Sequence, residues 1–419
     1  MNDVARGLNF PRDSTLTIIR APERKLENWL DAFYDYTADT PSPELFRKWG
    51  GVVCVAAALE RRVWGVSLNR ELYPSLYTFL VAPPGQGKTL ITDTVYSLLS
   101  RISDIHLAPT SVSRASLIDA LRDARNQVVD FQWGQMIYNS LCVIANELGV
   151  LLPAYEGDFM STLTDIYDCK PYAERKRTKD LDYKIEKPQI NLFAATTPSY
   201  LSDLLPKGAW NQGFISRVIL IYSGHSIKTS LFKKLPRRTE LEEKLVNDLA
   251  IIAKLNGPFT YSVPFQVAMD EWHSSHGPPT PEHPRLINYN ERRTVHRLKL
   301  AMICSAARSS SLQVEMQDFY MSGKLLFEAE EFMPDIFKAM AHGGDIDIIS
   351  EIWHDMVNRL KVGKGITLAS LNHAIGVRAP SHTVDRIFKL MTDAEYITEM
   401  PTENGVRTFV PKRNPTEEL

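Results

Sequence analysis

The stretch FLVAPPGQGKT at residues 79–89 constrains this chain more than any other part of its sequence. An apolar run with β-strand character, residues 76–81, breaks into a turn of prolines and glycines, and a helical pattern follows over residues 90–99. A strand, a glycine-rich loop and a helix in this order gather backbone N–H groups and the positive end of a helix around one point. Lys88 adds a cation and Thr89 a hydroxyl. The stretch therefore predicts a site for the phosphates of a nucleoside triphosphate.

The turn itself is expected to hold ATP. Its residues are Pro84, Gly85, Gln86, Gly87, Lys88 and Thr89. Lys88 would reach the β- and γ-phosphates, and the Thr89 hydroxyl would be a ligand of Mg²⁺. Ala82 stands where the general pattern has glycine, which is a common tolerance. The alternative is a chance turn of glycines and prolines, and the flanking strand and helix argue against it.

Composition and charge limit the class of protein that this chain can be. The chain has 419 residues, 44% hydrophobic and 23% charged, and a formal net charge of −2, so contact with nucleic acid needs a local basic patch. Its four cysteines are widely spaced and form no CxxC pair, which argues against a zinc site or a disulfide framework. No apolar run reaches the length of a signal peptide or a membrane span. We expect a soluble, cytoplasmic protein with no membrane partner.

Short apolar strands that alternate with helices predict an α/β fold with a parallel sheet flanked by helices. The expected core strands are residues 72–81, 141–145, 190–195 and 218–222. Three helices and a hairpin near the C-terminus have the layout of a winged helix. We divide the chain into an N-terminal arm and helices (1–70), a nucleotide-binding core (71–228), a helical lid (229–343) and a winged-helix domain (344–413).

Two polar residues follow the apolar strand LCVIA, which ends at residue 145. Glu147 is placed at the strand's carboxyl end to polarise an attacking water. Asn146 stands where an Asp usually holds the Mg²⁺ shell, and a neutral amide is a weaker partner for metal-bound water. We therefore expect slow hydrolysis. The alternative is an ordinary strand end before a loop.

Two further candidates come from the next strands. Thr197, with Thr196 as the alternate, ends the strand at residues 190–195 and would touch the γ-phosphate or its water, or cap the following helix. Arg217, in GFISR, precedes the last core strand. Its guanidinium can project onto a γ-phosphate bound by a neighbouring subunit, or it can be an ordinary surface residue.

The stretch ERRTVHRLKLA carries three arginines within six residues, Arg292, Arg293 and Arg297. One of them could reach the nucleotide from the lid, or the three could form a solvated face.

Residues 170–187 predict a charged hairpin, because seven basic and four acidic residues fall within them. Its tip contains Arg175, Lys176, Arg177 and Lys179. Cations on a protruding hairpin suit contact with the DNA backbone, and a solvated turn is the alternative.

The order of these parts, APPGQGKT, LCVIANE, the basic hairpin, FAATT and GFISR, resembles the AAA+ ATPases. Within them it is similar to the branch with a hairpin before the sensor strand, which includes superfamily 3 viral helicases and the minichromosome maintenance helicases. The stretch ERRTVHRLKLA looks like the sensor-2 helix of the latter, with Arg292 at the matching position. Residues 42–64 followed by 72–89 look like phage and prophage helicase-like ATPases.

The resemblance implies a ring, commonly of six subunits, with ATP and Mg²⁺ at subunit interfaces and hairpins that grip DNA in a central channel. Arg217 would then act on a neighbour's nucleotide. We expect an ATP-driven DNA helicase or translocase for replication of a phage or mobile element, with replication proteins as possible partners. Alternatives are an ATP-switched helicase loader, a DNA-bound recombination or transposition regulator, and a signalling ATPase. Whether the winged helix binds DNA or protein stays open.

Overall fold

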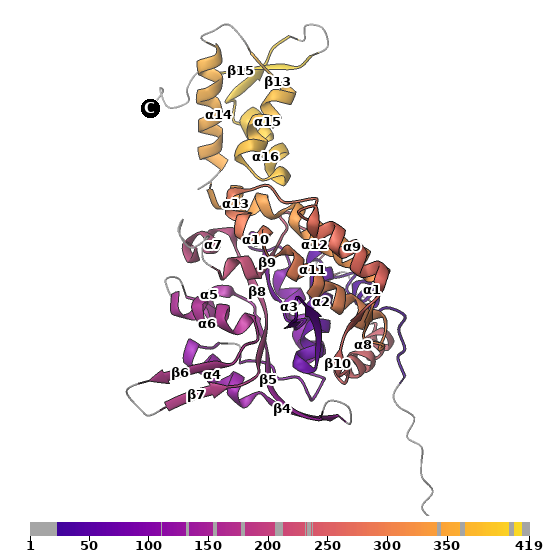
Figure 1. Cartoon of the computed structure of the whole chain (residues 1–419). Helices are drawn as coiled ribbons and strands as arrows, with labels where there is room; N and C mark the ends of the chain where they lie inside the picture. The colour runs from indigo at the N-terminus through magenta and orange to yellow at the C-terminus, as the bar shows by residue number, and fades with distance from the viewer. Residues whose placement is uncertain are drawn as a thin grey trace, which may run out of the picture.

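Five strands form the central sheet of the computed structural model, in the order β4-β5-β8-β3-β9 (Figure 1). The structure describes residues 23–109, 111–130, 134–153, 157–176, 181–205, 213–230, 232, 236, 238–341, 345–360, 365–401 and 406–412. The sheet consists of β4 (Arg125–Asp130), β5 (Gly134–Ala145), β8 (Pro188–Thr196), β3 (Tyr77–Val81) and β9 (Val218–Tyr222). β4 runs antiparallel to β5 and the other pairs are parallel. The chain is thus mixed α/β with a largely parallel sheet, as predicted.

Three strands, β3, β8 and β9, are buried throughout, because helices cover both faces of the sheet (Figure 1). Helices α2 (Glu44–Leu59) and α3 (Lys88–Leu99) lie on one face. Helices α5 (Leu148–Leu151) and α6 (Gly157–Tyr167) lie on the other. The apolar stripe of α2 is nearly continuous from Trp49 to Leu59, which suits a helix buried on most sides.

Connecting helices complete this layer. Helix α4 (Arg114–Asp123) begins at a capping serine, Ser113, and contacts β5, while α7 (Pro198–Leu204) follows β8. A 3₁₀ turn, η1 (Glu60–Arg62), leads from α2 to β1 (Val63–Ser67).

The first and last helices of the main body share one hydrophobic core with the sheet. Helix α1 (Trp29–Tyr36) buries Trp29 and Phe33 completely. The helices predicted as a lid also contribute to this core, and of these α11 contacts α2, while α12 and α13 contact β9. They are α8 (Thr239–Ile252), α9 (Val263–Ser274), α10 (Ile287–Asn290), α11 (Arg293–Arg308), α12 (Met316–Glu331) and α13 (Met333–Ala341).

Short strands pair residues that are distant in the sequence near the predicted lid helices. β1 pairs with β2 (Arg70–Leu72) and with β10 (Gly257–Pro258), and β11 (Thr260–Tyr261) pairs with β12 (Gln313–Val314).

Residues 345–412 hold a second, separate hydrophobic core. Its elements are α14 (Asp345–Leu360), β13 (Ile366–Thr367), α15 (Leu368–Arg378), α16 (Val384–Asp393), β14 (Ile397–Glu399) and β15 (Thr408–Pro411). β15 pairs antiparallel with both β13 and β14. The hairpin of β14 and β15 was predicted, whereas β13 was not, because two residues are too few to give a pattern.

This C-terminal unit touches the main body next to β9. The ring of His382, in the 3₁₀ turn η5 (Ser381–Thr383), lies 5.9 Å from the ring of Tyr222 and 5.5 Å from that of His225. The Ser381 hydroxyl donates a hydrogen bond to Asp335 on α13.

Candidate functional site: a cavity at the carboxyl edge of the sheet

The phosphate loop predicted within residues 79–89 connects β3 to α3 and is bent at Gly87. That residue caps α3 in the left-handed region, with φ of 69°. A Cβ atom at this position would also lie 2.4 Å from the carbonyl oxygen of Pro41. Glycine is therefore required twice, for the backbone conformation and for the close approach of the linker before α2.

Lys88 is folded back onto the loop. Its Nζ donates hydrogen bonds to the carbonyl oxygens of Ala82 at 2.7 Å and Pro83 at 2.9 Å. Desolvation lowers the pKa of Lys88 to about 8. The ammonium is thus half-buried, its hydrogen-bond partners among the described residues are two neutral carbonyls, and an anion at the loop would be a better partner.

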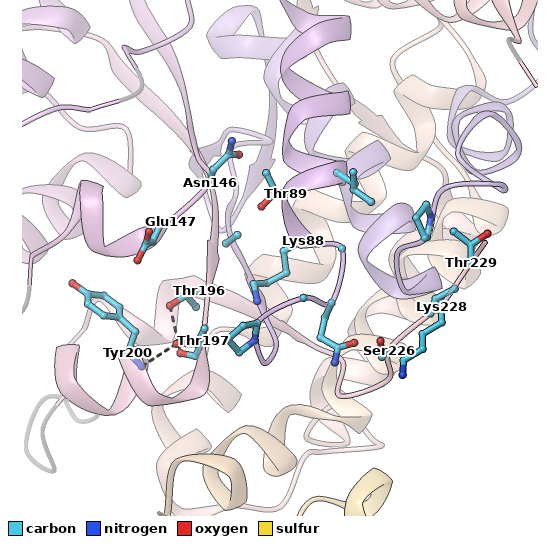
Figure 2. A pocket seen from close by; sticks show the side chains of 18 residues that line it. Lys88, Thr89, Asn146, Glu147, Thr196, Thr197, Tyr200, Ser226, Lys228 and Thr229 are labelled. Atoms are coloured by element: carbon cyan, nitrogen blue, oxygen red, sulfur yellow. Dashed lines mark hydrogen bonds between the residues drawn. The ribbon is translucent and has the colours of Figure 1, made fainter. Parts of the chain in front are cut away.

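A cavity of about 790 Å³ opens beside this loop, at the edge where the parallel strands end (Figure 2). Ligand cavities of that size hold molecules as large as a nucleotide. Its lining brings together the predicted residues of three strand ends, and they are Pro84, Gly85, Gln86, Gly87, Lys88, Thr89, Asn146, Glu147, Thr196 and Thr197. Parallel strands in register bring their carboxyl ends to one edge, which explains the convergence.

The cavity wall also contains residues that were not predicted from the sequence, among them Pro41, Tyr200 and residues 226–229. Ser226, Lys228 and Thr229 lie at the side of the loop remote from Glu147, and Tyr200 lies beside Thr197 (Figure 2). Residues 226–229 belong to the segment that follows β9, after residues 223–225, so a rule that searches the segment after every core strand would have found them.

Glu147 begins α5 and is exposed at the cavity wall. Among the described residues its carboxylate has no hydrogen-bond partner or ion pair, so it is available to a ligand or a water.

Asn146 has both ends of its amide engaged by helix α3. Its Oδ1 accepts from the hydroxyl of Thr92 at 2.5 Å, and its Nδ2 donates to Asp93 Oδ1 at 2.9 Å. The residue that stands in place of the usual Asp therefore has a carboxylate beside it, supplied by the helix that also carries Thr89.

Thr197 is a helix cap, as one of its two interpretations predicted, and it is also part of the cavity wall. It caps α7, because its Oγ1 accepts from the backbone N–H of Tyr200 at 3.2 Å, and it also lines the cavity. Tyr200 is held in turn by a hydrogen bond from its hydroxyl to Leu152 O at 2.6 Å.

The donor set fits a magnesium ion that is held mainly by phosphates. The exposed Thr89 hydroxyl, the Asn146 amide and the Glu147 carboxylate share one cavity with the phosphate loop. Mg²⁺ takes few protein ligands in such sites and keeps several waters. Within the described part of the chain, no cluster of three or more His, Cys, Asp or Glu side chains could bind a metal alone.

Arg217 and Arg292 lie away from this cavity and share one carboxylate. Arg217 Nη2 is 3.1 Å from Asp168 Oδ2, and Arg292 Nη1 is 3.8 Å from Asp168 Oδ1. Arg217 also donates to Gly213 O at 2.6 Å. Burial and the charge of Arg217 lower the pKa of Arg292.

The pairing of β3 with β9 puts the phosphate loop at the carboxyl end of the strands and Arg217 at their amino end. β3 and β9 pair in parallel from Tyr77 opposite Val218 to Val81 opposite Tyr222. The loop follows Val81, whereas Arg217 precedes Val218. Five residues of strand separate them by roughly 17 Å. Arg217 therefore cannot reach a nucleotide in its own subunit's cavity.

The other two arginines of the ERRTVHRLKLA stretch are buried. Arg293 pairs with Glu330 at 2.6 Å, and Arg297 lies between aromatic rings, 3.8 Å from the centre of Phe319 and 4.3 Å from that of Trp272. Both alternatives predicted from the sequence are therefore wrong for Arg293 and Arg297, because these side chains are neither on a solvated face nor in contact with the cavity.

The predicted hairpin forms. β6 (Tyr172–Lys176) pairs antiparallel with β7 (Leu181–Ile185) and projects from the body (Figure 1). Arg175 and Lys176 belong to β6, while Arg177 and Lys179 lie outside the described residues.

Comparison with known proteins gives no assignment. No protein-family model matches the sequence, and no curated protein matches it. No helix of the described chain combines the length and the apolar character needed to cross a bilayer.

Proposed function

We propose that this chain is an AAA+ ATPase that acts as a DNA helicase or translocase, with a winged-helix unit at its C-terminus. The observation that carries the proposal is the division of the site between two edges of one sheet. The phosphate loop, Glu147 and Thr197 converge on a nucleotide-sized cavity, and Arg217 lies at the opposite edge. Such a chain completes its site only when a second copy supplies the arginine.

In this scheme the loop and Lys88 bind the phosphates of ATP, and Thr89 with Asn146 would hold Mg²⁺. The ion would neutralise charge on the phosphates when bound. Glu147 orients and deprotonates the attacking water, and Thr197 positions it. Arg217 of one copy stabilises charge on the nucleotide of the next, which favours a closed ring, commonly a hexamer.

DNA contact is assigned to the β6–β7 hairpin, with Arg175, Lys176, Arg177 and Lys179 on the phosphates. Its protrusion and its basic tip support this assignment. Changing Lys176 and Arg177 together to Ala should weaken DNA affinity and reduce its salt dependence. An unchanged salt dependence would contradict it.

The decisive assay is strand displacement on a forked duplex. Wild-type protein should displace the strand with ATP, and Lys88→Ala and Glu147→Gln should not. Lys254→Ala, which removes an exposed lysine on the helical side, is the control and should behave as wild type.

One observation favours a second function, an ATP-switched loader or regulator of DNA-bound assemblies. Asn146 is neutral and its amide is tied to α3, so hydrolysis should be slow. Protein that binds ATP and DNA but displaces no strand would support this second function over the first.

A further inference from the structure

Asp168 pairs with two arginines and lies in the segment that leads from α6 into the hairpin. Asp168 follows the last residue of α6, Tyr167, and precedes β6 by three residues. It is the shared partner of Arg217 and Arg292, and its side chain is 36% exposed. One carboxylate opposite two guanidiniums leaves excess positive charge at this edge.

The two ends of the hairpin meet at a single buried guanidinium. Arg61, in η1, donates from Nη1 to the carbonyl oxygen of Cys169 at 2.6 Å and to that of Pro188 at 2.9 Å. Arg61 is 6% exposed and lies over the ring of Tyr73 at 4.1 Å. The entry and the exit of the hairpin are therefore fixed at one point.

Cys169 lies between that fixed point and Asp168 in an unusual conformation. Its φ is 54°, in the left-handed region that side chains other than glycine rarely adopt. Such residues persist where surrounding contacts hold them, and they cluster at active sites and switch regions. Asp168 is on one side of this residue and the hairpin is on the other.

We propose that Asp168 is a positioning residue that couples the arginine pair to the hairpin. With no nucleotide opposite them, Arg217 and Arg292 are held by Asp168. A terminal phosphate carries more negative charge than a carboxylate and offers three oxygens to guanidinium forks, so it takes both arginines from Asp168. The released Asp168 then lets the hairpin turn about Cys169. The inference rests on the proposed function, because the phosphate belongs to a nucleotide bound by a second copy.

Hydrogen exchange of the hairpin amides tests this coupling. The assembled full-length chain is compared with and without a non-hydrolysable ATP analogue and Mg²⁺. In the wild type, the analogue should speed exchange in β6 and β7 at least threefold. Asp168→Asn should show the fast rate without analogue and no further change when it is added. Asp168→Glu, which keeps the carboxylate, should restore the response.

The matched control is Asp165→Asn, which removes an exposed carboxylate one turn earlier on α6. It should respond as the wild type does. Analogue binding is measured on the same samples by fluorescence. If the wild type binds no analogue, the proposed function fails and the coupling with it. If it binds and Asp168→Asn still shows the wild-type response, the coupling alone is refuted.

Discussion

Changing Asn146 to Asp should destabilise the protein unless a divalent cation is present. The substitution replaces Nδ2, which lies 2.9 Å from Asp93 Oδ1, by a second carboxylate oxygen. Two unit charges at that distance repel by about 1.4 kcal/mol even in water. The lost hydrogen bond adds about 1 kcal/mol. Because both side chains are exposed and can turn apart, we expect a net loss of roughly 2 kcal/mol.

Thermal unfolding in low salt with EDTA at pH 7 measures this loss, which corresponds to a melting temperature lower by roughly 4 °C. Mg²⁺ should restore stability by neutralising the pair, and NaCl should restore part of it by screening. Asn146→Asp combined with Asp93→Asn reverses the donor and acceptor and should melt as the wild type does. Equal melting of the single and double variants in EDTA would refute the pairing of Asn146 with Asp93.

Three further predictions can each be tested by a binding or an unfolding measurement. Affinity for an ATP analogue should fall about tenfold between pH 7 and pH 9, because the pKa of free Lys88 is about 8 and the bound form must be charged, whereas Lys88→Arg should show no such fall. Gly87→Ala should abolish analogue binding and cost about 2 kcal/mol or more in denaturant unfolding through strain and the clash with Pro41, while Gly157→Ala, with open space around its Cβ, should do neither. Arg61→Met should cost about 3 kcal/mol by leaving two buried carbonyl oxygens without a donor, and the exposed Arg70→Met should cost nothing measurable.

The sequence was informative about the sheet where strands are buried on both sides. β3, β8 and β9 are mostly apolar, so their composition separates them from loops. β4 was missed because RNQVVD is mostly polar, as suits an edge strand with one partner. Helix α1 was predicted as part of an N-terminal arm, yet its Trp29 and Phe33 are buried in the main core. The arm's sequence does not reveal that Trp29 donates a hydrogen bond to Leu245 O on a helix more than 200 residues away.

Part of the candidate site could likewise be predicted from the sequence, and part could not. Lys88, Glu147 and Thr197 follow strands, and parallel pairing forces strand ends together, so their convergence could be predicted. The contacts of Asn146 with Thr92 and Asp93 depend on how α3 packs against β5, which no local pattern encodes. Asp168 was missed for a related reason, because an aspartate after a helix has no distinctive spacing.

Strand β9 has a consequence for any assembly of this chain. Arg217 lies at its start, and residues 226–229, soon after its end, line the chain's own cavity. A fully buried strand is among the stiffest parts of a protein. If Arg217 contacts the nucleotide of a neighbouring copy, β9 rigidly connects two successive nucleotide sites. A displacement of the strand at one site would then be transmitted to the other site without bending the sheet. The order in which the sites of a ring hydrolyse ATP would then depend on how the five residues of β9 pack in the core.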